Sequence, residues 1–369
     1  MNSKFLPGLG VLTGTMIGAG FLGIPYVVSK SGFFPGLLHL IFIAVFILFV
    51  KLYLGEVLLR TKGNHQLTGY AEKYLGKWGK SLMFFSMVFG IYGALLAYLI
   101  AEGKSLSFFI FGNYNYSFAL SLGFWFVLTC LSYIGLKALK FYEKIAMILV
   151  CGVLIAITVF LSPNINMGNL NYIGNNLFVP FGVILFSFLA FSALPEVRRV
   201  LSSQEDKMKK VIITATIIAF AVYLLFTIIV VGVYGKSVNE IATLSLGRYF
   251  SILGILTMFT AFFSSTISIR DMFRFDFNMG RFWGWLLASF IPLVLFFVLY
   301  FFNGVGFIQI LGLAGVISGG LAGILILLMN YKAKKSGNRK PEYTLRINNW
   351  VIFILSLIFV IGVVLELIF

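Results

Sequence analysis

The sequence predicts an all-α integral membrane protein, on the evidence of its composition and of the spacing of its apolar runs. Of its 369 residues, 60% are hydrophobic and 11% are charged, whereas soluble domains contain roughly 45–50% apolar and about 25% charged residues. Apolar runs of roughly 20 residues recur along the whole chain, and each is long enough to cross a hydrocarbon core about 30 Å thick. No segment has the composition of a separate soluble domain. We therefore expect residues 1–369 to form a single transmembrane domain.

Eleven apolar windows are predicted to be transmembrane helices. The first begins near Leu6, is longer than the core of a signal peptide and is followed by no small-residue cleavage site, so we expect it to be retained. The predicted spans are residues 6–28, 34–59, 81–102, 117–136, 142–161, 176–195, 211–233, 248–269, 282–302, 306–330 and 348–368.

The basic residues predict the orientation of these spans. If the amino terminus is inside, 23 of the 28 Lys and Arg residues fall in inside segments, which is the bias that the positive-inside rule describes. The outside segments hold only Lys30, Lys104, Lys236 and Arg248. We therefore expect a plasma-membrane protein with a cytoplasmic amino terminus and an extracellular carboxy terminus. The net charge of +16 follows from this topology and gives no reason to expect a nucleic-acid partner.

Segments outside the spans carry little chemistry. Loop 60–80 has apolar residues at helical spacing between its charges, which predicts a short amphipathic helix on the cytoplasmic surface. Both cysteines lie in apolar runs, and neither histidine has metal-ligand spacing. The sequence contains no nucleophile and base pair and no phosphate-binding loop, so we expect no enzyme and no cofactor apart from a coupling ion. The oligomeric state stays open.

The first span contains an unusual stretch, "GTMIGAGFLGIP", from Gly14 to Pro25. Glycine leaves the helix easily because it lacks a side chain. A helix can unwind at the bilayer centre where its freed N–H and C=O groups bind a ligand, and many secondary transporters build their sites in this way. The alternative is close helix packing, since Gly14 and Gly18 form a G-x-x-x-G pair.

The sixth span contains a second interruption, "FSFLAFSALP", in which small and polar residues precede Pro195. The two interrupted spans occupy matching positions if residues 6–161 and 176–330 are inverted halves of five spans each, with residues 348–369 as an additional helix. Paired interruptions of this kind indicate a substrate site near the middle of the membrane.

These motifs also carry a resemblance to known permeases. "GTMIGAGFLGIPY", "LTGYAEKYLGKWG" and "FSFLAFSALPEV" resemble the amino acid/auxin permease family and the hydroxy and aromatic amino acid permeases, within the amino acid, polyamine and organocation superfamily. The similarity follows the chain from the first span to the eleventh, and the first motif is the specific one. It implies the LeuT-type fold, with five plus five inverted spans and an eleventh helix.

The resemblance also implies a set of substrate-binding residues. The substrate carboxylate would meet N–H groups of Ala19 and Gly20, in space that Gly18 and Gly20 leave free, and the ammonium would meet backbone carbonyls. Tyr98 resembles a position whose hydroxyl contacts the carboxylate; Tyr92 is a rival, and either tyrosine could be an ordinary buried aromatic residue. The carbonyls are those of Met16, Phe186 and Ser187, and the side-chain pocket would be formed by Phe188 and Ala190.

The eighth span contains a candidate sodium site. Ala261, Ser264 and Ser265 lie on one helical face, and sodium-coupled members of the LeuT fold place such residues opposite first-span carbonyls, here those of Gly14 and Ile17. Counting about 1.5 Å per residue from the span centres puts both groups at one level. The alternative is that small hydroxylated residues mark a helix contact.

Lys51 leaves the coupling ion open. It lies about nine residues, or roughly 13 Å, from the cytoplasmic end of the second span. An ammonium there would replace sodium and make the carrier proton-coupled or uncoupled, because burial disfavours the charged form of an amine. The alternative is a lysine that faces a wet cytoplasmic vestibule.

The sequence as a whole favours a secondary active transporter that imports a neutral amino acid by alternating access, with sodium as the favoured coupling ion. The rival function is an amino acid receptor of the same fold that binds its ligand without moving it. The sequence leaves the identity of the amino acid and the direction of physiological flux open.

Overall fold

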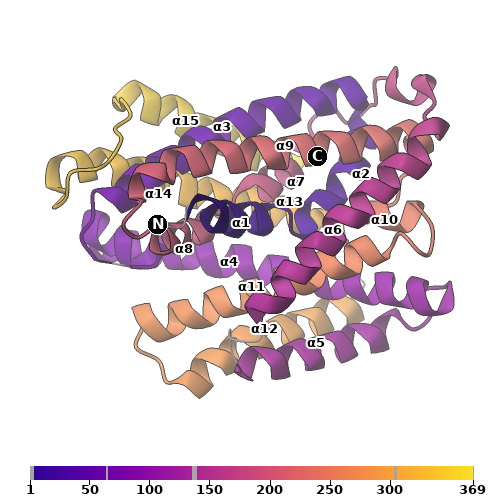
Figure 1. Cartoon of the computed structure of the whole chain (residues 1–369), viewed down its shortest axis with the longest axis horizontal. Helices are drawn as coiled ribbons and strands as arrows, with labels where there is room; N and C mark the ends of the chain where they lie inside the picture. Colours follow the sequence, from indigo (N-terminus) through magenta and orange to yellow (C-terminus); the bar gives the residue numbers. More distant parts are fainter. Residues whose placement is uncertain (1–3, 64, 135–138, 303–305, 369) are drawn as a thin grey trace.

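The computed structural model describes residues 4–63, 65–134, 139–302 and 306–368, with side chains from residue 149 onward in the third of these ranges. Within these residues the chain is helical, and its one β-type contact is an isolated bridge between Gly32 and Ile173. Ten helices in the described ranges are long and apolar enough to cross a membrane, which makes the chain a multi-pass membrane protein. They run side by side along the long direction of the bundle (Figure 1). The side chains of Lys137, Lys140 and Lys144, predicted to be inside, lie outside the described residues.

Eight of the predicted spans coincide with continuous helices. These are α3 Phe33–Leu59, α4 Leu67–Phe111, α5 Ser117–Ile134, α6 Leu139–Leu161, α9 Met208–Tyr234, α11 Ile252–Asp276, α12 Arg281–Phe301 and α15 Asn349–Ile368. Helix α6 matches the fifth predicted span but is not among the ten, because its described side chains begin at Leu149. The count of eleven spans therefore stays a prediction.

The other three spans are interrupted, and two of these interruptions are the predicted ones. The first span consists of α1 Phe5–Met16, η1 Ala19–Gly23 and α2 Ile24–Ser31; the sixth of α7 Pro180–Phe188, η4 Phe191–Ala193 and α8 Leu194–Val200; the tenth of α13 Phe307–Leu313, the π-helical turn η7 Ala314–Ser318 and α14 Gly319–Ser336. Shorter elements are η2 Ser162–Asn164, η3 Met167–Leu170, η5 Glu205–Lys207, η6 Gly235–Ser237 and α10 Ala242–Ser245.

Local backbone geometry explains the two predicted breaks. At the first, Gly18 is extended, with φ −90° and ψ −156°. At the second, Ala190 adopts the left-handed conformation with φ 42° and ψ 27°, which is rare for a residue with a side chain. The half-helix after each break has a proline in its first turn, Pro25 in α2 and Pro195 in α8. At this position proline's missing N–H costs no hydrogen bond.

The two broken helices pack against each other in opposite directions. Helix α2 packs on α7, α1 packs on α8, and η1 contacts the end of α7. The half-helix before the first break thus packs on the half-helix after the second break, and the half-helix after the first break packs on the half-helix before the second. The inverted repeat and the LeuT-type fold stay predictions.

The third interruption was not predicted. The π-helical turn η7 lies between α4 and α7, where the Ser86 hydroxyl donates to the Ser318 carbonyl at 2.8 Å. A methyl group at Gly315 would lie 3.0 Å from both the Cβ and the N of Phe186, so glycine is required for this close approach. A π-helical turn inserts a residue into a helix and occurs often at functional sites.

Helix α15 attaches to the outer half of the second broken helix. The Glu366 carboxylate lies against the backbones of Gly182 in α7 and Gly312 in α13, where any side chain would clash with it. The Phe359 ring packs on Phe46 with the ring centroids 4.6 Å apart. Most other apolar side chains of α15 are exposed, as expected for a helix that faces lipid.

The amphipathic helix in loop 60–80 is confirmed in part. Helix α4 begins at Leu67, and its first turns bury Leu67, Tyr70 and Tyr74. Trp78, predicted for the same apolar face, is 83% exposed. Gly76 explains the difference, because its φ of 75° turns the residues that follow away from that face.

Segments predicted to be inside meet at one end of the bundle. The Lys4 ammonium donates to the Ser202 carbonyl at 2.6 Å, and the Arg198 guanidinium donates to the Thr61 carbonyl at 2.8 Å. Three more arginine-to-carbonyl bonds stand at this end, Arg339 to Leu59, Arg270 to Ser132 and Arg281 to Tyr133. The segments that were predicted to be on the inner side of the membrane therefore lie together at one end of the bundle.

Segments predicted to be outside meet at the opposite end. The Gly174 N–H donates to the Ser31 carbonyl at 2.9 Å, and Arg248 donates to the Phe109 carbonyl at 2.6 Å. The two chain termini lie in opposite halves of the bundle (Figure 1). The structure thus groups the loops as predicted, and the side of the membrane that each group faces is a prediction from loop charge.

Accessibility labelling tests this orientation. We expect single cysteines at Lys207 and Ser336 to react with a membrane-impermeant maleimide only from the cytoplasm, and a cysteine within 164–171 only from outside, because the positive segments stay inside. Cys130 and Cys151 are exposed and are first replaced by serine. Labelling of either group from the opposite side would contradict the predicted topology.

Candidate functional site

The two predicted breaks lie against each other in the middle of the bundle. A methyl group at Gly20 would lie 2.9 Å from Cδ1 of Phe186 and 3.0 Å from Oγ of Ser187, so η1 touches the end of α7. A methyl group at Gly18 would lie 3.3 Å from Cβ of Ala261 in α11. The structure therefore brings together residues from three of the predicted spans. Gly14 does not seat a neighbouring helix, since a methyl group there would meet nothing within 4 Å.

The first break offers backbone hydrogen-bond donors. Gly18, Ala19 and Gly20 are buried, and none of their N–H groups bonds to another element within the described residues. The first N–H groups of a helical turn have no partner inside it, and they carry the positive end of the helix dipole. This arrangement suits an anion such as a carboxylate.

Tyr223 of α9 joins the two breaks and was missed in the sequence. Its hydroxyl lies 2.5 Å from the Met16 carbonyl and 2.9 Å from the Ser187 carbonyl. Met16 is the last residue of α1, and Ser187 is the last but one of α7. A hydroxyl has one proton, so it donates to one of these carbonyls at a time. The ring stacks on Phe21 with centroids 5.9 Å apart and meets the edge of Phe188 at 4.9 Å. No local signal marks Tyr223 among the 17 tyrosines.

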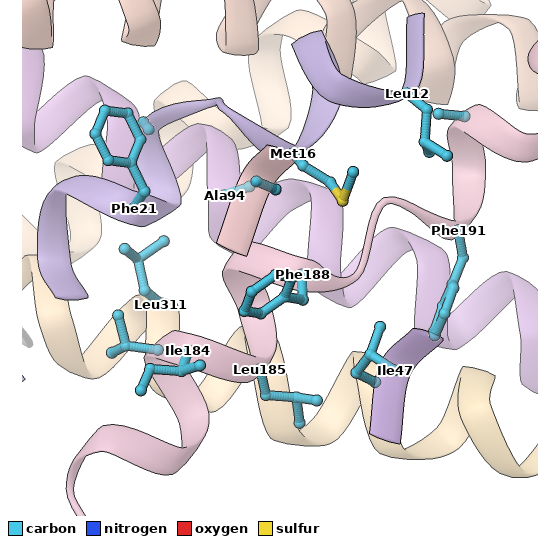
Figure 2. Packing of buried hydrophobic residues seen from close by; sticks show 14 of the residues in the cluster. Leu12, Met16, Phe21, Ile47, Ala94, Ile184, Leu185, Phe188, Phe191 and Leu311 are labelled. Carbon is cyan, nitrogen blue, oxygen red and sulfur yellow. The ribbon is translucent and has the colours of Figure 1, made fainter. Parts of the chain in front are cut away.

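Lys51 of α3 also contacts residues at the two breaks. Its side chain is fully buried, and its ammonium lies 2.8 Å from the Met16 sulfur and 5.9 Å from the centroid of the Phe188 ring. Figure 2 shows the Met16 and Phe188 side chains between the interrupted helices. In this conformation Lys51 therefore does not face a wet vestibule; it contacts two of the predicted substrate-binding residues.

The structure separates the two candidate tyrosines of α4. The Tyr92 hydroxyl donates to the Leu287 carbonyl of α12 at 3.0 Å, which gives it a structural partner away from the breaks. Tyr98 is 5% exposed, makes no hydrogen bond to another described residue, and lies close enough to Tyr223 for the two to interact electrostatically. One turn further along the helix, Glu102 is buried with a carboxylate oxygen that has no partner in the described residues. Tyr92 thus has a structural partner and Tyr98 has none in the described residues, and a contact between Tyr98 and the substrate stays a prediction.

Phe186, Phe188 and Ala190 surround the second break. Phe188 is fully buried, and Phe186 and Ala190 are half-buried. The left-handed backbone of Ala190 is a conformation that side chains disfavour and that clusters at functional sites. The assignment of Phe188 and Ala190 to the side-chain pocket, and of the Phe186 carbonyl to the substrate ammonium, stays a prediction.

The predicted sodium ligands lie on the first and eighth spans, which approach each other at the first break. Gly18 packs on Ala261; Gly14 lies one turn inward on α1, and Ser264 and Ser265 lie one turn inward on α11. Other hydroxyls of α11 donate to carbonyls of their own helix, those of Thr257, Thr260 and Thr266. The two serines make no hydrogen bond within the described residues, and they are half-buried, like Ile17. Their hydroxyl oxygens are therefore available to a ligand. No group of three or more His, Cys, Asp and Glu that could hold a metal is present in the described residues.

The chain is similar in sequence to known transporters. The chain is 23% identical to glutamine transporter 2 of Aliivibrio fischeri over 378 aligned residues, which cover 94% of each chain. It is 25% identical to tyrosine-specific transport system 1 of Haemophilus influenzae over 362 residues, which cover 90% of this chain and 88% of the relative. The tryptophan/tyrosine permease family matches residues 1–369, and the chain therefore belongs to that family.

Proposed function

We propose that this protein is a secondary active transporter that imports a neutral amino acid by alternating access. The family and the two transporters that the chain resembles support amino acid transport. The observation that carries the proposal is the meeting of two broken helices, where unpartnered N–H groups lie beside buried carbonyls. Such a site matches the carboxylate and the ammonium that all amino acids share.

The proposed site assigns each end of the substrate to backbone groups. The carboxylate binds the N–H groups of Ala19 and Gly20, in the space beside Gly18, with the Tyr98 hydroxyl as a further donor. The ammonium binds carbonyls at the ends of the inner half-helix α1 and of α7. Tyr223 shares its one proton between two of these carbonyls, so one of them always has an acceptor position for the ammonium. The carbonyls are those of Met16, Phe186 and Ser187, with Phe188 and Ala190 setting selectivity.

Alternating access requires that the inner end of the site opens. In the structure α8 is tied to its surroundings, because Arg198 pairs with Glu205 at 3.0 Å and donates to the carbonyls of Thr61 and Gly63. We propose that opening toward the cytoplasm breaks these contacts as the halves 6–161 and 176–330 move relative to each other, in a LeuT-type cycle.

Sodium is the proposed coupling ion. The carbonyls of Gly14, Ile17 and Ala261 and the hydroxyls of Ser264 and Ser265 would supply five oxygen ligands, and the two serine hydroxyls are free to do so. The alternative coupling uses Lys51, whose buried ammonium lies next to Met16, in a proton-coupled or uncoupled carrier. The alternative function is an amino acid receptor with the same site.

Uptake by purified protein in liposomes tests these proposals together. We expect radiolabelled neutral amino acid to accumulate when a sodium gradient is imposed. Accumulation that ignores sodium and follows an imposed proton gradient would overturn the sodium proposal and favour Lys51. Binding without any uptake would favour the receptor.

The serine pair tests the sodium ligands. Ser264→Ala combined with Ser265→Ala is expected to raise the sodium concentration for half-maximal uptake by about tenfold or more, because two of five oxygen ligands are lost. The effect on amino acid affinity should shrink at saturating sodium, since linkage between the two ligands is reciprocal. Thr260→Ala is the matched control, because its hydroxyl already donates to Leu256. An unchanged sodium dependence in the double variant would overturn the site.

A further inference from the structure

Lys51 carries an ammonium group that has no counter-ion. Its side chain is fully buried, and no carboxylate of the described residues lies within ion-pair distance. The nearest acidic residue on its own helix is Glu56, which pairs with Arg60 at 2.8 Å and with Lys334 at 3.4 Å. A buried charge without a partner is costly, and the contacts of Lys51 do little to offset it: a thioether is a weak acceptor, and a ring centroid at 5.9 Å is near the limit for a cation–π contact.

Other groups with positive character lie in the same break as the Lys51 ammonium. The N–H groups of Gly18, Ala19 and Gly20 point the positive end of a helical turn into the same break. The Tyr223 hydroxyl has one proton for the Met16 and Ser187 carbonyls, so one of these two acceptors stays open for the substrate ammonium. The part of the break formed by these N–H groups and the Lys51 ammonium is therefore complementary to a negative group, beside the carbonyl that accepts from the substrate ammonium.

The position of Lys51 suggests which step of transport it serves. It touches Met16, the last residue of α1, and so lies on the cytoplasmic side of the break, inward of the N–H groups of Ala19 and Gly20. Met16 is unbranched and flexible, so its side chain can move aside for a ligand. The Phe188 ring borders the same space (Figure 2).

We propose that the Lys51 ammonium is a second contact for the substrate carboxylate, on the cytoplasmic side of the first break. The inference rests on the proposed amino acid transport and extends it: the carboxylate passes from the backbone N–H groups to the Lys51 ammonium as the substrate moves inward. Lys51 is thus a binding residue that selects for a free α-carboxylate, which differs from a role in coupling to protons.

The test compares an amino acid with its α-carboxamide, which has the same side chain and ammonium but no carboxylate. The twenty standard amino acids are first screened for binding to the purified parent protein, and the tightest binder is paired with its amide. In Lys51→Met we expect affinity for the amino acid to fall by about 10- to 100-fold, the loss expected when a charged hydrogen bond disappears. Affinity for the amide should change less than threefold, which also shows that the variant is folded.

Lys104→Met is the matched control, since Lys104 is a half-buried lysine near the outer end of α4; it should keep the parent's preference for the free acid. Equal losses for acid and amide in Lys51→Met would overturn the proposal in favour of a purely structural lysine, and an unchanged preference would overturn it as well. Failure of the parent to bind any amino acid would instead overturn the proposed function on which the inference rests.

Discussion

Tyr223→Phe is expected to lower the rate of amino acid uptake by about 10- to 100-fold while the protein stays folded. The variant keeps the ring that stacks on Phe21 and meets Phe188 edge-on. It removes the donor that the Met16 and Ser187 carbonyls share. A buried acceptor left without a donor costs about 1–3 kcal/mol, and the two broken helices lose their common tie. Initial rates of radiolabelled uptake in liposomes measure the effect.

A second measurement separates the site from general stability. Because the substrate ammonium would supply the missing donor, thermal stabilisation by the amino acid should be larger in Tyr223→Phe than in the parent. Tyr92→Phe is the matched control, since it also removes a bond between a tyrosine hydroxyl and a carbonyl, that of Leu287, but outside the breaks. Equal loss of uptake in both variants would show that Tyr223 acts through stability alone.

Gly20→Leu should abolish substrate binding, a loss of about 100-fold or more in affinity. Even a methyl group at Gly20 would stand 2.9 Å from the Phe186 ring, and the larger side chain would fill the space beside the N–H groups that meet the carboxylate. Gly18→Leu should act in the same way, because Gly18 packs on Ala261. Equilibrium binding of radiolabelled amino acid to the purified variants measures this.

Gly10→Leu is the control for the glycine variants. Gly10 belongs to the same half-helix α1, but a methyl group there would meet nothing within 4 Å, so binding should match the parent. All three variants should elute as single species on size exclusion. Parent-like affinity in Gly18→Leu or Gly20→Leu would mean that these glycines serve helix packing.

The sequence predicts the first two breaks because their cause is local. Clustered glycines before Pro25 mark the first break, and small and polar residues before Pro195 mark the second. The structure interrupts the helix after Met16 and after Phe188. The tenth span also has clustered glycines, among them Gly312, Gly315, Gly319 and Gly320, but no proline follows them closely, and its π-helical turn was not predicted. At this turn Gly315 approaches Gly182 and Phe186, a contact between distant parts of the chain that the sequence pattern does not indicate.

The same distinction explains which site residues could be found. Lys51 stands out in the sequence because a charge that deep in a span is rare. Tyr223 does not, because its significance comes from a hydroxyl bond to Met16, 207 positions away. In the sequence, Glu102 likewise looks like the polar end of an apolar span, because that span was predicted to end at residue 102. In the structure α4 continues to Phe111, and Glu102 is buried.

Counterflow is the most direct test of the central claim, that one site at the two breaks is exposed alternately to each side of the membrane. Liposomes that contain the protein are loaded with unlabelled amino acid and diluted into a trace of the same labelled compound, with no ion gradient. Alternating access predicts a transient accumulation of label inside, which Gly20→Leu abolishes. Saturable binding of the amino acid with no labelled compound entering loaded liposomes would contradict the transporter and leave a receptor.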